Sequence, residues 1–261
     1  MDNPEPLSYG WAAIFGAVQG LTEFLPVSSS GHLALAQHWG RGQTENMAFD
    51  VLLHLATLGV VGLTYGRTWL AWWRERRAVF FYAAAATVPA GAAGWLLHHR
   101  VEQFREYPAA IGACFLVTAA ALFLSERLAA RTRTVEALGW RRALAVGFCQ
   151  AAALLPGISR SGFTLSGGLA CGLSREDALA FSFTLAVPVM GGAGLLEGMK
   201  AVRHPGSFSA LPAAGPCAAG CLAAFAAGWA ALWALKRISL SGRLWVFSVY
   251  LALLGLACIV F

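Results

Sequence analysis

The chain has 261 residues, of which 58% are hydrophobic and 12% are charged, and its formal net charge is +6. Soluble globular proteins carry about 25% charged residues, so this composition excludes an ordinary soluble domain. Several apolar runs reach about 20 residues, the length that crosses a bilayer as a helix. The basic residues lie in short segments between these runs, which indicates membrane orientation rather than nucleic-acid binding. The sequence therefore predicts an all-α polytopic membrane protein that binds no nucleic acid, with residues 1–261 in a single membrane domain.

The first unusual stretch, FGAVQGLTEFLPVSSSGH, runs from Phe15 to His32. It begins as an apolar helix that carries Gln19 and Glu23 one turn apart, on one face. Pro26 then breaks the helix, and a run of serines follows. A carboxylate within hydrocarbon costs at least about 2.5 kcal/mol, so it usually serves chemistry, an ion or a substrate. The alternative without function is a helix that frays into a Ser-rich loop.

Three apolar spans follow, over about 47–66, 78–98 and 109–125. Basic clusters follow the first and third spans, so both clusters lie on one side of the membrane, which should be cytoplasmic. These clusters contain Arg67, Arg74, Arg76 and Arg77, and Arg127, Arg131, Arg133, Arg141 and Arg142. The acidic N-terminus and the segment after His32 then both lie outside. Residues 8–32 are therefore predicted to form a re-entrant helical hairpin, which needs cover from protein or a watery cavity.

The second half of the chain repeats this pattern. GFCQAAALLPGISRSG aligns with GAVQGLTEFLPVSSSG at an offset of 131 residues, which matches Gly16 with Gly147 and Gln19 with Gln150. The same offset places the three spans on apolar runs near 178–200, 211–235 and 244–261. We therefore expect an inverted-topology repeat with halves at about 8–125 and 140–261, each one hairpin plus three transmembrane helices. Such repeats place a site at their interface, near mid-membrane.

The second hairpin contains PGISRSGFT, which begins at Pro156 and surrounds Arg160 with glycines and hydroxyls. Glycine-rich turns let backbone amides approach an anion, and arginine offers a planar fork of donors that matches phosphate oxygens. An arginine in a membrane hairpin therefore indicates an anionic ligand. The structural alternative is a helix cap with Arg160 extended to the membrane surface.

Together the two hairpins hold the groups that phosphoryl transfer requires. Glu23 and the Gln19 carbonyl could hold a hard divalent cation, Mg²⁺ or Ca²⁺, since both prefer oxygen ligands. Arg160 would stabilise charge on the transferring group. A substrate with a lipid tail would reach this site laterally from the bilayer.

The nucleophile has several candidates in the first hairpin. Ser29 or Ser28 could attack, with His32 as the general base. His32 could equally attack directly or activate water. The residues leave these alternatives open.

QGLTEFLPVSSSGH and PGISRSGFT resemble the two signature regions of the undecaprenyl-diphosphate phosphatase, or bacitracin-resistance, family. FDVLLHLATLGVV (49–61) and TVPAG (87–91) extend the resemblance over nearly the whole chain. The resemblance implies hydrolysis of undecaprenyl diphosphate to undecaprenyl phosphate and phosphate, with a divalent cation. It also implies a place in the bacterial inner membrane, with the site open to the periplasm, where the enzyme recycles the lipid carrier for cell-wall synthesis.

Matched by position to these signatures, the site falls into three sets. The predicted catalytic residues are Glu23, Ser29, His32 and Arg160; the substrate-binding residues are Ser28, Ser159, Arg160, Ser161 and Thr164; the metal ligands are Gln19 and Glu23. This chain has Gln19 where many members have glutamate, which removes one negative charge. His54 and Asp50 are interpreted as polar residues of their span, with contact to the site as the alternative.

Other functions remain as alternatives. A polyprenyl-phosphate flippase or transporter would share the inverted repeat, although it does not require Ser29, His32 and Glu23 in one hairpin. Other membrane lipid phosphatases need an Arg-Pro element, and the chain contains no Arg-Pro pair. The expected partners are the lipid substrate and membrane lipids, with the protein a monomer or a homodimer.

Overall fold

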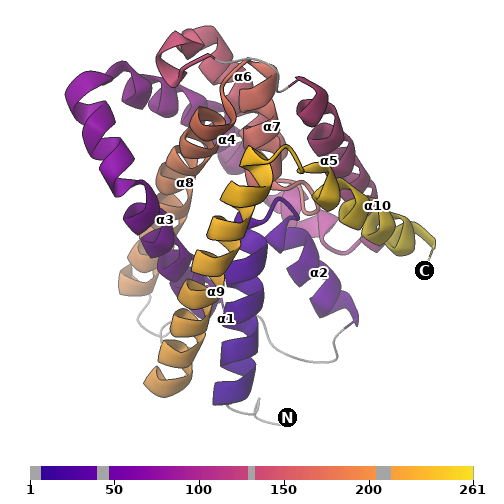
Figure 1. Ribbon diagram of the computed structural model, residues 1–261. Coiled ribbons are helices and arrows are strands. Elements are labelled where there is room, and N and C mark those ends of the chain that lie inside the picture. The colour runs from indigo at the N-terminus through magenta and orange to yellow at the C-terminus, as the bar shows by residue number, and fades with distance from the viewer. Residues whose placement is uncertain (1–6, 40–46, 129–132, 204–212, 261) are drawn as a thin grey trace.

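A computed structural model describes residues 7–39, 47–128, 133–203 and 213–260 (Figure 1). This part of the chain is helical apart from its turns and one isolated bridge between Arg133 and Leu173. The helices are α1 (Tyr9–Phe24), α2 (Ser29–Trp39), α3 (Met47–Glu75), α4 (Ala78–Phe104), α5 (Pro108–Leu128), the short 3₁₀ helix η1 (Val135–Leu138), α6 (Gly139–Ala152), α7 (Arg160–Ala170), α8 (Arg175–Arg203), α9 (Ala214–Leu240) and α10 (Trp245–Val260).

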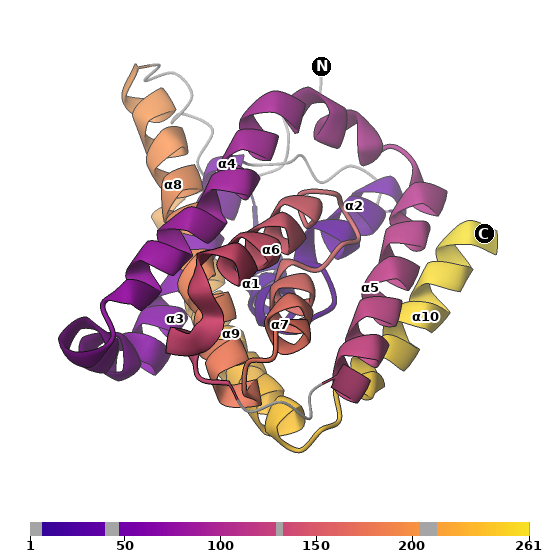
Figure 2. The same ribbon diagram turned by 90° about the horizontal axis from the view of Figure 1, so that it is seen from above.

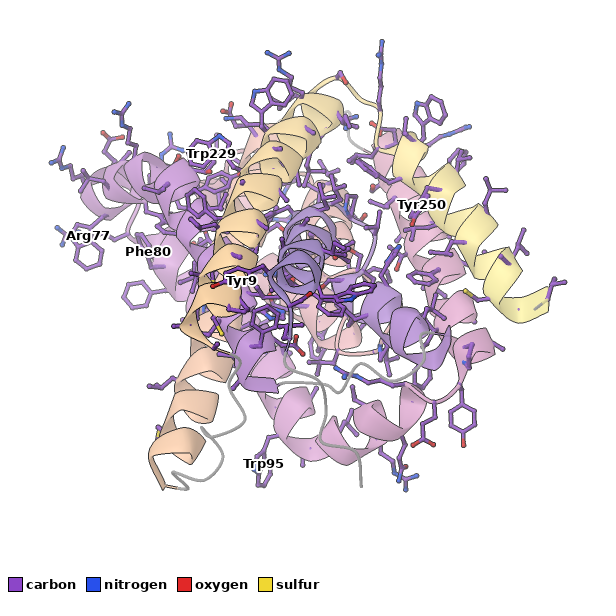
Figure 3. All side chains as sticks on the ribbon, turned by 90° about the horizontal axis from the view of Figure 1, so that it is seen from below. Tyr9, Arg77, Phe80, Trp95, Trp229 and Tyr250 are labelled. Carbon is purple, nitrogen blue, oxygen red and sulfur yellow. The ribbon has the colours of Figure 1, made fainter. Side chains whose placement is uncertain are left out.

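The predicted all-α membrane fold is confirmed at this level. Within the described residues, four helical segments are long and apolar enough to cross a bilayer: Ala48–Glu75, Ala78–Leu97, Pro108–Arg127 and Ala214–Leu240. The predicted spans over 178–200 and 244–261 correspond to α8 and α10, which are not among these four; α10 is apolar but has 16 residues. Large apolar side chains such as Phe81 and Leu253 are exposed, and Figure 3 shows side chains that project outward around the helices, Trp95 and Trp229 among them. Such a surface suits lipid rather than water.

Both predicted hairpins are pairs of short helices with a sharp turn between them. The turn between α1 and α2 follows from Pro26, because the residue before proline is disfavoured in helical conformation; Leu25 is extended, with ψ 142°. The turn between α6 and α7 ends at Ser159, whose side chain accepts a hydrogen bond from the Gly162 N–H at 3.1 Å and so caps α7. Seen from above, the two pairs lie at the centre of the longer helices (Figure 2).

The helices pack in cross-half pairs. The main contacts join α1 to α9, α4 to α6, α5 to α10, and α3 to both α8 and α9. The beginning of α8, from Ala178 to Ala186, is buried throughout. Each short pair is therefore held against a long helix of the other half of the chain.

The prediction that the basic clusters lie in loops between the spans is wrong for five of these arginines, which lie inside helices: Arg67 and Arg74 in α3, Arg127 in α5, and Arg141 and Arg142 in α6. Helix α3 continues beyond the apolar span because arginine is a good helix former and its long side chain can extend to the membrane surface. Four arginines, each within three residues of a helix end, contact aromatic rings, as is typical of a membrane interface. The pairs are Arg77 with Trp73, Arg127 with Phe123, Arg141 with Trp140 and Arg237 with Trp233.

Glycines allow the closest helix contact, between α1 and α9. A Cβ atom added at Gly16 would lie 2.0 Å from the Gly220 carbonyl oxygen, and one added at Gly20 would lie 2.3 Å from the Ala224 carbonyl oxygen. Small residues at such an interface let two backbones approach within membranes.

Gly20→Ala is expected to destabilise the protein by about 1–3 kcal/mol, because the added methyl group forces the backbones of α1 and α9 apart. The measurement is the thermal unfolding midpoint in detergent. Gly62→Ala is the matched control, since a Cβ atom there meets nothing within 4 Å. Equal midpoints for the two variants would contradict the close α1–α9 contact.

Candidate active site

The turns of the two hairpins meet through the side chain of Ser28. Its hydroxyl accepts a hydrogen bond from the Gly157 N–H at 3.2 Å and donates to the Ile158 carbonyl at 3.3 Å. Ser28 is only 4% exposed and has φ 69°, an uncommon conformation for a residue other than glycine. A second link runs back, from the Ser161 hydroxyl to the Leu25 carbonyl at 3.3 Å. Ser28, predicted to bind substrate, therefore lies at the junction of the two hairpins.

Thr118 of α5 fixes the second turn from behind. Its hydroxyl donates to the Gly157 carbonyl at 3.1 Å and accepts from the Ser159 N–H at 3.2 Å. Gly157 has φ 95°, and a Cβ atom there would lie 2.5 Å from the Ile111 carbonyl oxygen. Only glycine fits this turn without strain, so the Pro-Gly pair seen in the sequence has a structural cause.

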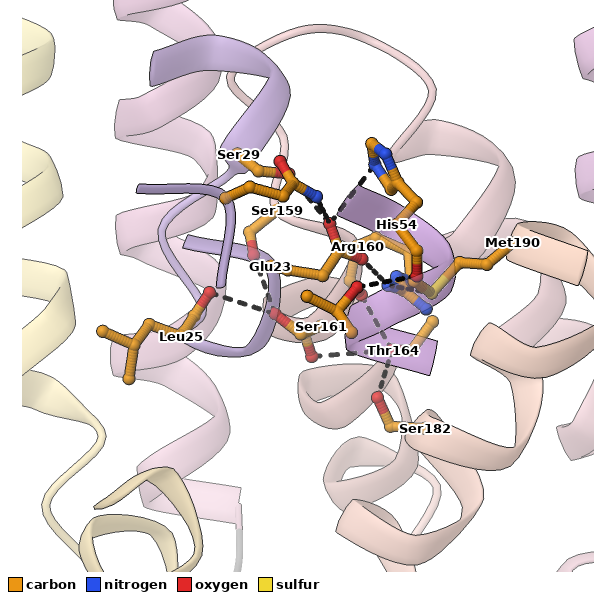
Figure 4. Close-up of polar contacts among 12 residues, drawn as sticks. Glu23, Leu25, Ser29, His54, Ser159, Arg160, Ser161, Thr164, Ser182 and Met190 are labelled. Atoms are coloured by element: carbon orange, nitrogen blue, oxygen red, sulfur yellow. Dashed lines mark hydrogen bonds and ion pairs between the residues drawn. The ribbon is translucent and has the colours of Figure 1, made fainter. Parts of the chain in front are cut away.

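Glu23 lies at the centre of the site and is 8% exposed (Figure 4). Its Oε1 atom accepts a hydrogen bond from Nη2 of Arg160, so the acid of the first hairpin pairs with the arginine of the second. Its Oε2 atom accepts from Gln19 Nε2 at 3.0 Å and from the Ser29 hydroxyl at 3.1 Å. His54 Nε2 lies 3.7 Å from the same Oε2 atom. The two carboxylate oxygens thus face two different sets of groups.

Arg160 is the first residue of α7, and its side chain is 16% exposed. Its Nη2 atom contacts Glu23 and the Met190 sulfur, the latter at 3.4 Å. Its Nη1 atom is buried and has no hydrogen-bond partner among the residues that the structure describes. A buried donor without a partner costs free energy, and a phosphate oxygen would satisfy it.

The other predicted phosphate-binding hydroxyls bond within the protein. Ser159 and Ser161 lie with their hydroxyl oxygens 3.2 Å apart. The Thr164 hydroxyl donates to the Arg160 carbonyl at 2.7 Å and lies beside the hydroxyl of Ser182 in α8. These three residues surround the backbone of Arg160, and in this structure they hold the turn that carries it.

His32 and Ser29, the predicted catalytic pair, use different partners. The Ser29 hydroxyl is directed to Glu23. His32 Nδ1 lies 2.8 Å from the Ser28 carbonyl oxygen, and its Nε2 lies 2.7 Å from the hydroxyl of Tyr250 in α10. Because a carbonyl oxygen only accepts, Nδ1 carries the hydrogen and Nε2 accepts from Tyr250. In this arrangement Glu23, rather than His32, is the base within reach of Ser29.

Three residues from the long helices also contact the site. His54 was interpreted as a polar residue of its span with contact to the site as the alternative, and the alternative holds, since His54 contacts Glu23. Sequence reasoning missed the other two. Tyr250 and Thr118 contact the site from α10 and α5, and each lies in an apolar run with no neighbouring motif. For His54 a signal existed: ionisable residues, histidine included, are rare within membrane spans and by default warrant a functional interpretation.

The donor set around Glu23 fits a divalent cation that shares phosphate oxygens with a substrate. It offers one carboxylate, the Gln19 amide and the Ser29 hydroxyl. No group of three His, Cys, Asp or Glu side chains suited to a metal occurs in the described part of the chain. Mg²⁺ is often held by one or two carboxylates together with substrate phosphates. These donors therefore fit a divalent cation if the phosphate oxygens of a bound diphosphate supply the remaining ligands.

Comparison with known proteins identifies the family of this chain. The family model described as bacitracin resistance protein BacA matches residues 12–257. A protein of Methanosphaera stadtmanae named undecaprenyl-diphosphatase is 38% identical over 210 residues, which cover 71% of this chain and 75% of the relative. A protein with the same name from Thermosipho melanesiensis is 40% identical over 70% of this chain and 76% of its own length. Another, from Rubrobacter xylanophilus, is 40% identical over 71% of this chain and 74% of its own length.

Proposed function

Because this chain belongs to the bacitracin resistance protein BacA family, we propose that it hydrolyses undecaprenyl diphosphate to undecaprenyl phosphate and inorganic phosphate. The contact between Glu23 and Arg160 carries this proposal, since it joins a proton acceptor and an anion-binding group from two hairpins far apart in the sequence. The product would serve again as the lipid carrier of cell-wall synthesis. The enzyme is thus a hydrolase that acts on a phosphoric anhydride.

The site favours a phosphate group on electrostatic grounds. α2 begins at Ser29 and α7 begins at Arg160, and the Ser28 contacts hold these two N-termini together. Helix N-termini attract anions through their free N–H groups and the helix dipole. Discontinuous helices in membrane transporters use the same arrangement toward anionic substrates. The Nη1 atom of Arg160, which has no partner among the described residues, adds a donor matched to a phosphate oxygen.

In the proposed mechanism, Arg160 binds the terminal phosphate and stabilises the charge that develops on it. The Ser29 hydroxyl, already directed to Glu23, attacks the terminal phosphorus while its proton passes to the Glu23 carboxylate. The bond between this phosphorus and the bridging oxygen breaks, and undecaprenyl phosphate leaves with the bridging oxygen. The departing undecaprenyl phosphate takes the proton from Glu23. Water then attacks the phosphoserine phosphorus and gives one proton to the Glu23 carboxylate; the bond between phosphorus and the Ser29 oxygen breaks, Glu23 returns the proton to that oxygen, and inorganic phosphate leaves.

Two other routes share these contacts. Water could take the place of Ser29 beside Glu23, and the same carboxylate would then accept its proton. His32 could act only after its Nε2 atom is released by Tyr250. A divalent cation, Mg²⁺ or Ca²⁺, held by Glu23 and Gln19 would neutralise the diphosphate and favour departure of the leaving group.

The packing of the helices supports an inverted repeat. In the two halves, α1 to α5 correspond in order to α6 to α10. The α1–α9 contact of one half then corresponds to the α6–α4 contact of the other, and the α3–α8 and α5–α10 pairs each correspond to themselves. Gly16 and its counterpart Gly147 both allow close approach: a Cβ atom at Gly147 would lie 2.4 Å from the Ala86 carbonyl oxygen. In this proposal α1–α2 and α6–α7 are re-entrant hairpins that enter from opposite sides and meet within the membrane.

The proposed location is the bacterial inner membrane, with the site open to the periplasm. The ends of α3, α5 and α9 and the start of α6 carry the arginine–aromatic pairs, as expected at a cytoplasmic surface. Both hairpins come from one chain, so the site is complete in a monomer, and a homodimer would not need to supply a residue to it.

The test is phosphate release from undecaprenyl diphosphate by the purified protein in detergent, with Mg²⁺ or Ca²⁺ present and after chelation. We expect release by the protein with a cation and little release after chelation. A folded protein that releases no phosphate from undecaprenyl diphosphate or from shorter polyprenyl diphosphates would overturn the proposal and favour transport.

A further inference from the structure

We propose that His54 is a ligand of the site's divalent cation, and that the site therefore favours cations that accept nitrogen, such as Mn²⁺, over Ca²⁺. This inference rests on the proposed function, since it concerns the cation of the same site. It adds an imidazole from α3 to a donor set that otherwise contains only oxygen and amide groups.

The hydrogen bond at the other side of the ring sets the tautomer of His54. Its Nδ1 atom lies 2.8 Å from the carbonyl oxygen of Asp50, one turn earlier in α3. A carbonyl oxygen only accepts, so Nδ1 carries a hydrogen, and Nε2 is the ring nitrogen that can offer a lone pair to a cation. Histidines that bind metals commonly donate their other N–H to a backbone carbonyl in this way, which fixes the ring's orientation.

The lone pair of His54 then faces a second acceptor. Its Nε2 atom lies 3.7 Å from Oε2 of Glu23, and both atoms bear electron pairs. Two acceptors that face each other repel unless a positive charge lies between them. The side chain of His54 is 37% exposed, whereas that of Glu23 is 7% exposed, so the histidine is the more accessible member of the pair.

The geometry separates a cation position from the arginine position. Arg160 contacts Oε1 of Glu23, whereas Gln19, Ser29 and His54 all face Oε2. A cation on the Oε2 side could therefore bind without removing Arg160 from the other oxygen. Rotation of the Gln19 amide would turn its oxygen toward the cation, an exchange that leaves the shape of the side chain unchanged.

The chemistry of the donors then determines the preferred ion. Ca²⁺ takes six to eight oxygen ligands and Mg²⁺ prefers oxygen and water, so an imidazole contributes little to either. Affinity for sites with nitrogen donors rises from Mn²⁺ toward Cu²⁺. Mn²⁺ also accepts carboxylate and phosphate oxygens, which makes it a suitable probe for a mixed site shared with a diphosphate.

The charged side chains that the structure places at this position come from two other helices. Glu23 of α1 contacts His54, and Arg160 of α7 contacts the other oxygen of the same carboxylate. Described charged side chains of α8 and α9 gather instead around the far end of α3, near Glu75: Glu176, Asp177 and Lys236. The competing explanation is a proton on His54 Nε2, which would form an ion pair with Glu23 and leave no place for a cation.

Electron paramagnetic resonance of bound Mn²⁺ tests this inference without any turnover. The probe is Mn²⁺ with methylenediphosphonate, a diphosphate that is not hydrolysed, added to the purified protein. We expect spin-echo modulation from a histidine nitrogen in the wild type and its loss in His54→Gln. We also expect Mn²⁺ affinity to fall at least about tenfold in His54→Gln, while Ca²⁺ affinity changes less than about threefold because glutamine still offers an oxygen.

His32→Gln is the matched control, since His32 is held by Ser28 and Tyr250, away from Oε2. It should keep both the nitrogen modulation and the Mn²⁺ affinity. Absence of modulation in the wild type, or equal Mn²⁺ affinity in His54→Gln with an unchanged unfolding midpoint, would overturn the role of His54. Failure of the wild type to release phosphate would instead overturn the proposed function and leave these binding data intact.

Discussion

Arg160→Ala is expected to lower kcat for phosphate release from undecaprenyl diphosphate at least about a hundredfold. Removal of one group that stabilises transition-state charge typically costs about 10²–10³ in rate. Arg160 is poised for this role because its Nη1 atom is buried and has no partner among the described residues. The measurement is inorganic phosphate release under saturating substrate, with KM determined for each protein.

Arg160→Lys separates charge from geometry. Lysine keeps the positive charge but lacks the planar fork that matches two phosphate oxygens, so we expect activity between that of the wild type and Arg160→Ala. Arg141→Ala is the matched control, because Arg141 lies over Trp140 at the start of the same hairpin, away from the site. Turnover close to wild type by Arg160→Ala would remove Arg160 from the mechanism.

Glu23→Gln is expected to cause a loss of similar size, about a hundredfold or more, in the same assay. The substitution keeps the shape of the side chain but removes the proton acceptor for Ser29 and the single carboxylate of the donor set. General acid–base catalysis alone typically contributes about 10²–10⁴ in rate. Glu136→Gln is the control, because Glu136 pairs with Arg76 near the ends of α3 and α6, away from the site.

Loss of Glu23 should also leave Arg160 as a buried charge without a partner. Breaking a buried ion pair on one side typically costs about 3–5 kcal/mol, so the thermal unfolding midpoint of Glu23→Gln should fall. Inorganic phosphate should restore this midpoint more than it raises that of the wild type, because the anion would replace the missing carboxylate. A midpoint that does not respond to phosphate would argue against an anion site at Arg160.

Much of the architecture follows from simple patterns in the sequence. Apolar runs of about 20 residues predict long helices, and the break at Pro26 and the turn at Gly157 follow from backbone chemistry. Glu23 and Arg160 drew attention because charges within hydrocarbon are costly. The structure brings these two residues into contact, as the repeat interface predicts.

Other features depend on tertiary contacts that no local pattern encodes. Ser28 resembles its neighbours in a serine run, yet it joins the two turns because its hydroxyl meets Gly157 and Ile158. Tyr250 lies 218 positions from the histidine that it contacts. The repeat also conceals a difference: Gln19 contacts Glu23, whereas neither side-chain polar atom of its counterpart Gln150 has a partner among the described residues.

Double-mutant analysis of Glu23 and Arg160 tests the central claim, that two hairpins from opposite halves of the chain form one catalytic unit. Phosphate release would be compared among wild type, Glu23→Gln, Arg160→Ala and the double variant. The effects of residues that act as a unit are strongly non-additive. The activity of the double variant should therefore be only slightly below that of the less active single variant. Losses that multiply, to about ten thousandfold if each single loss is about a hundredfold, would show two independent sites and contradict the claim.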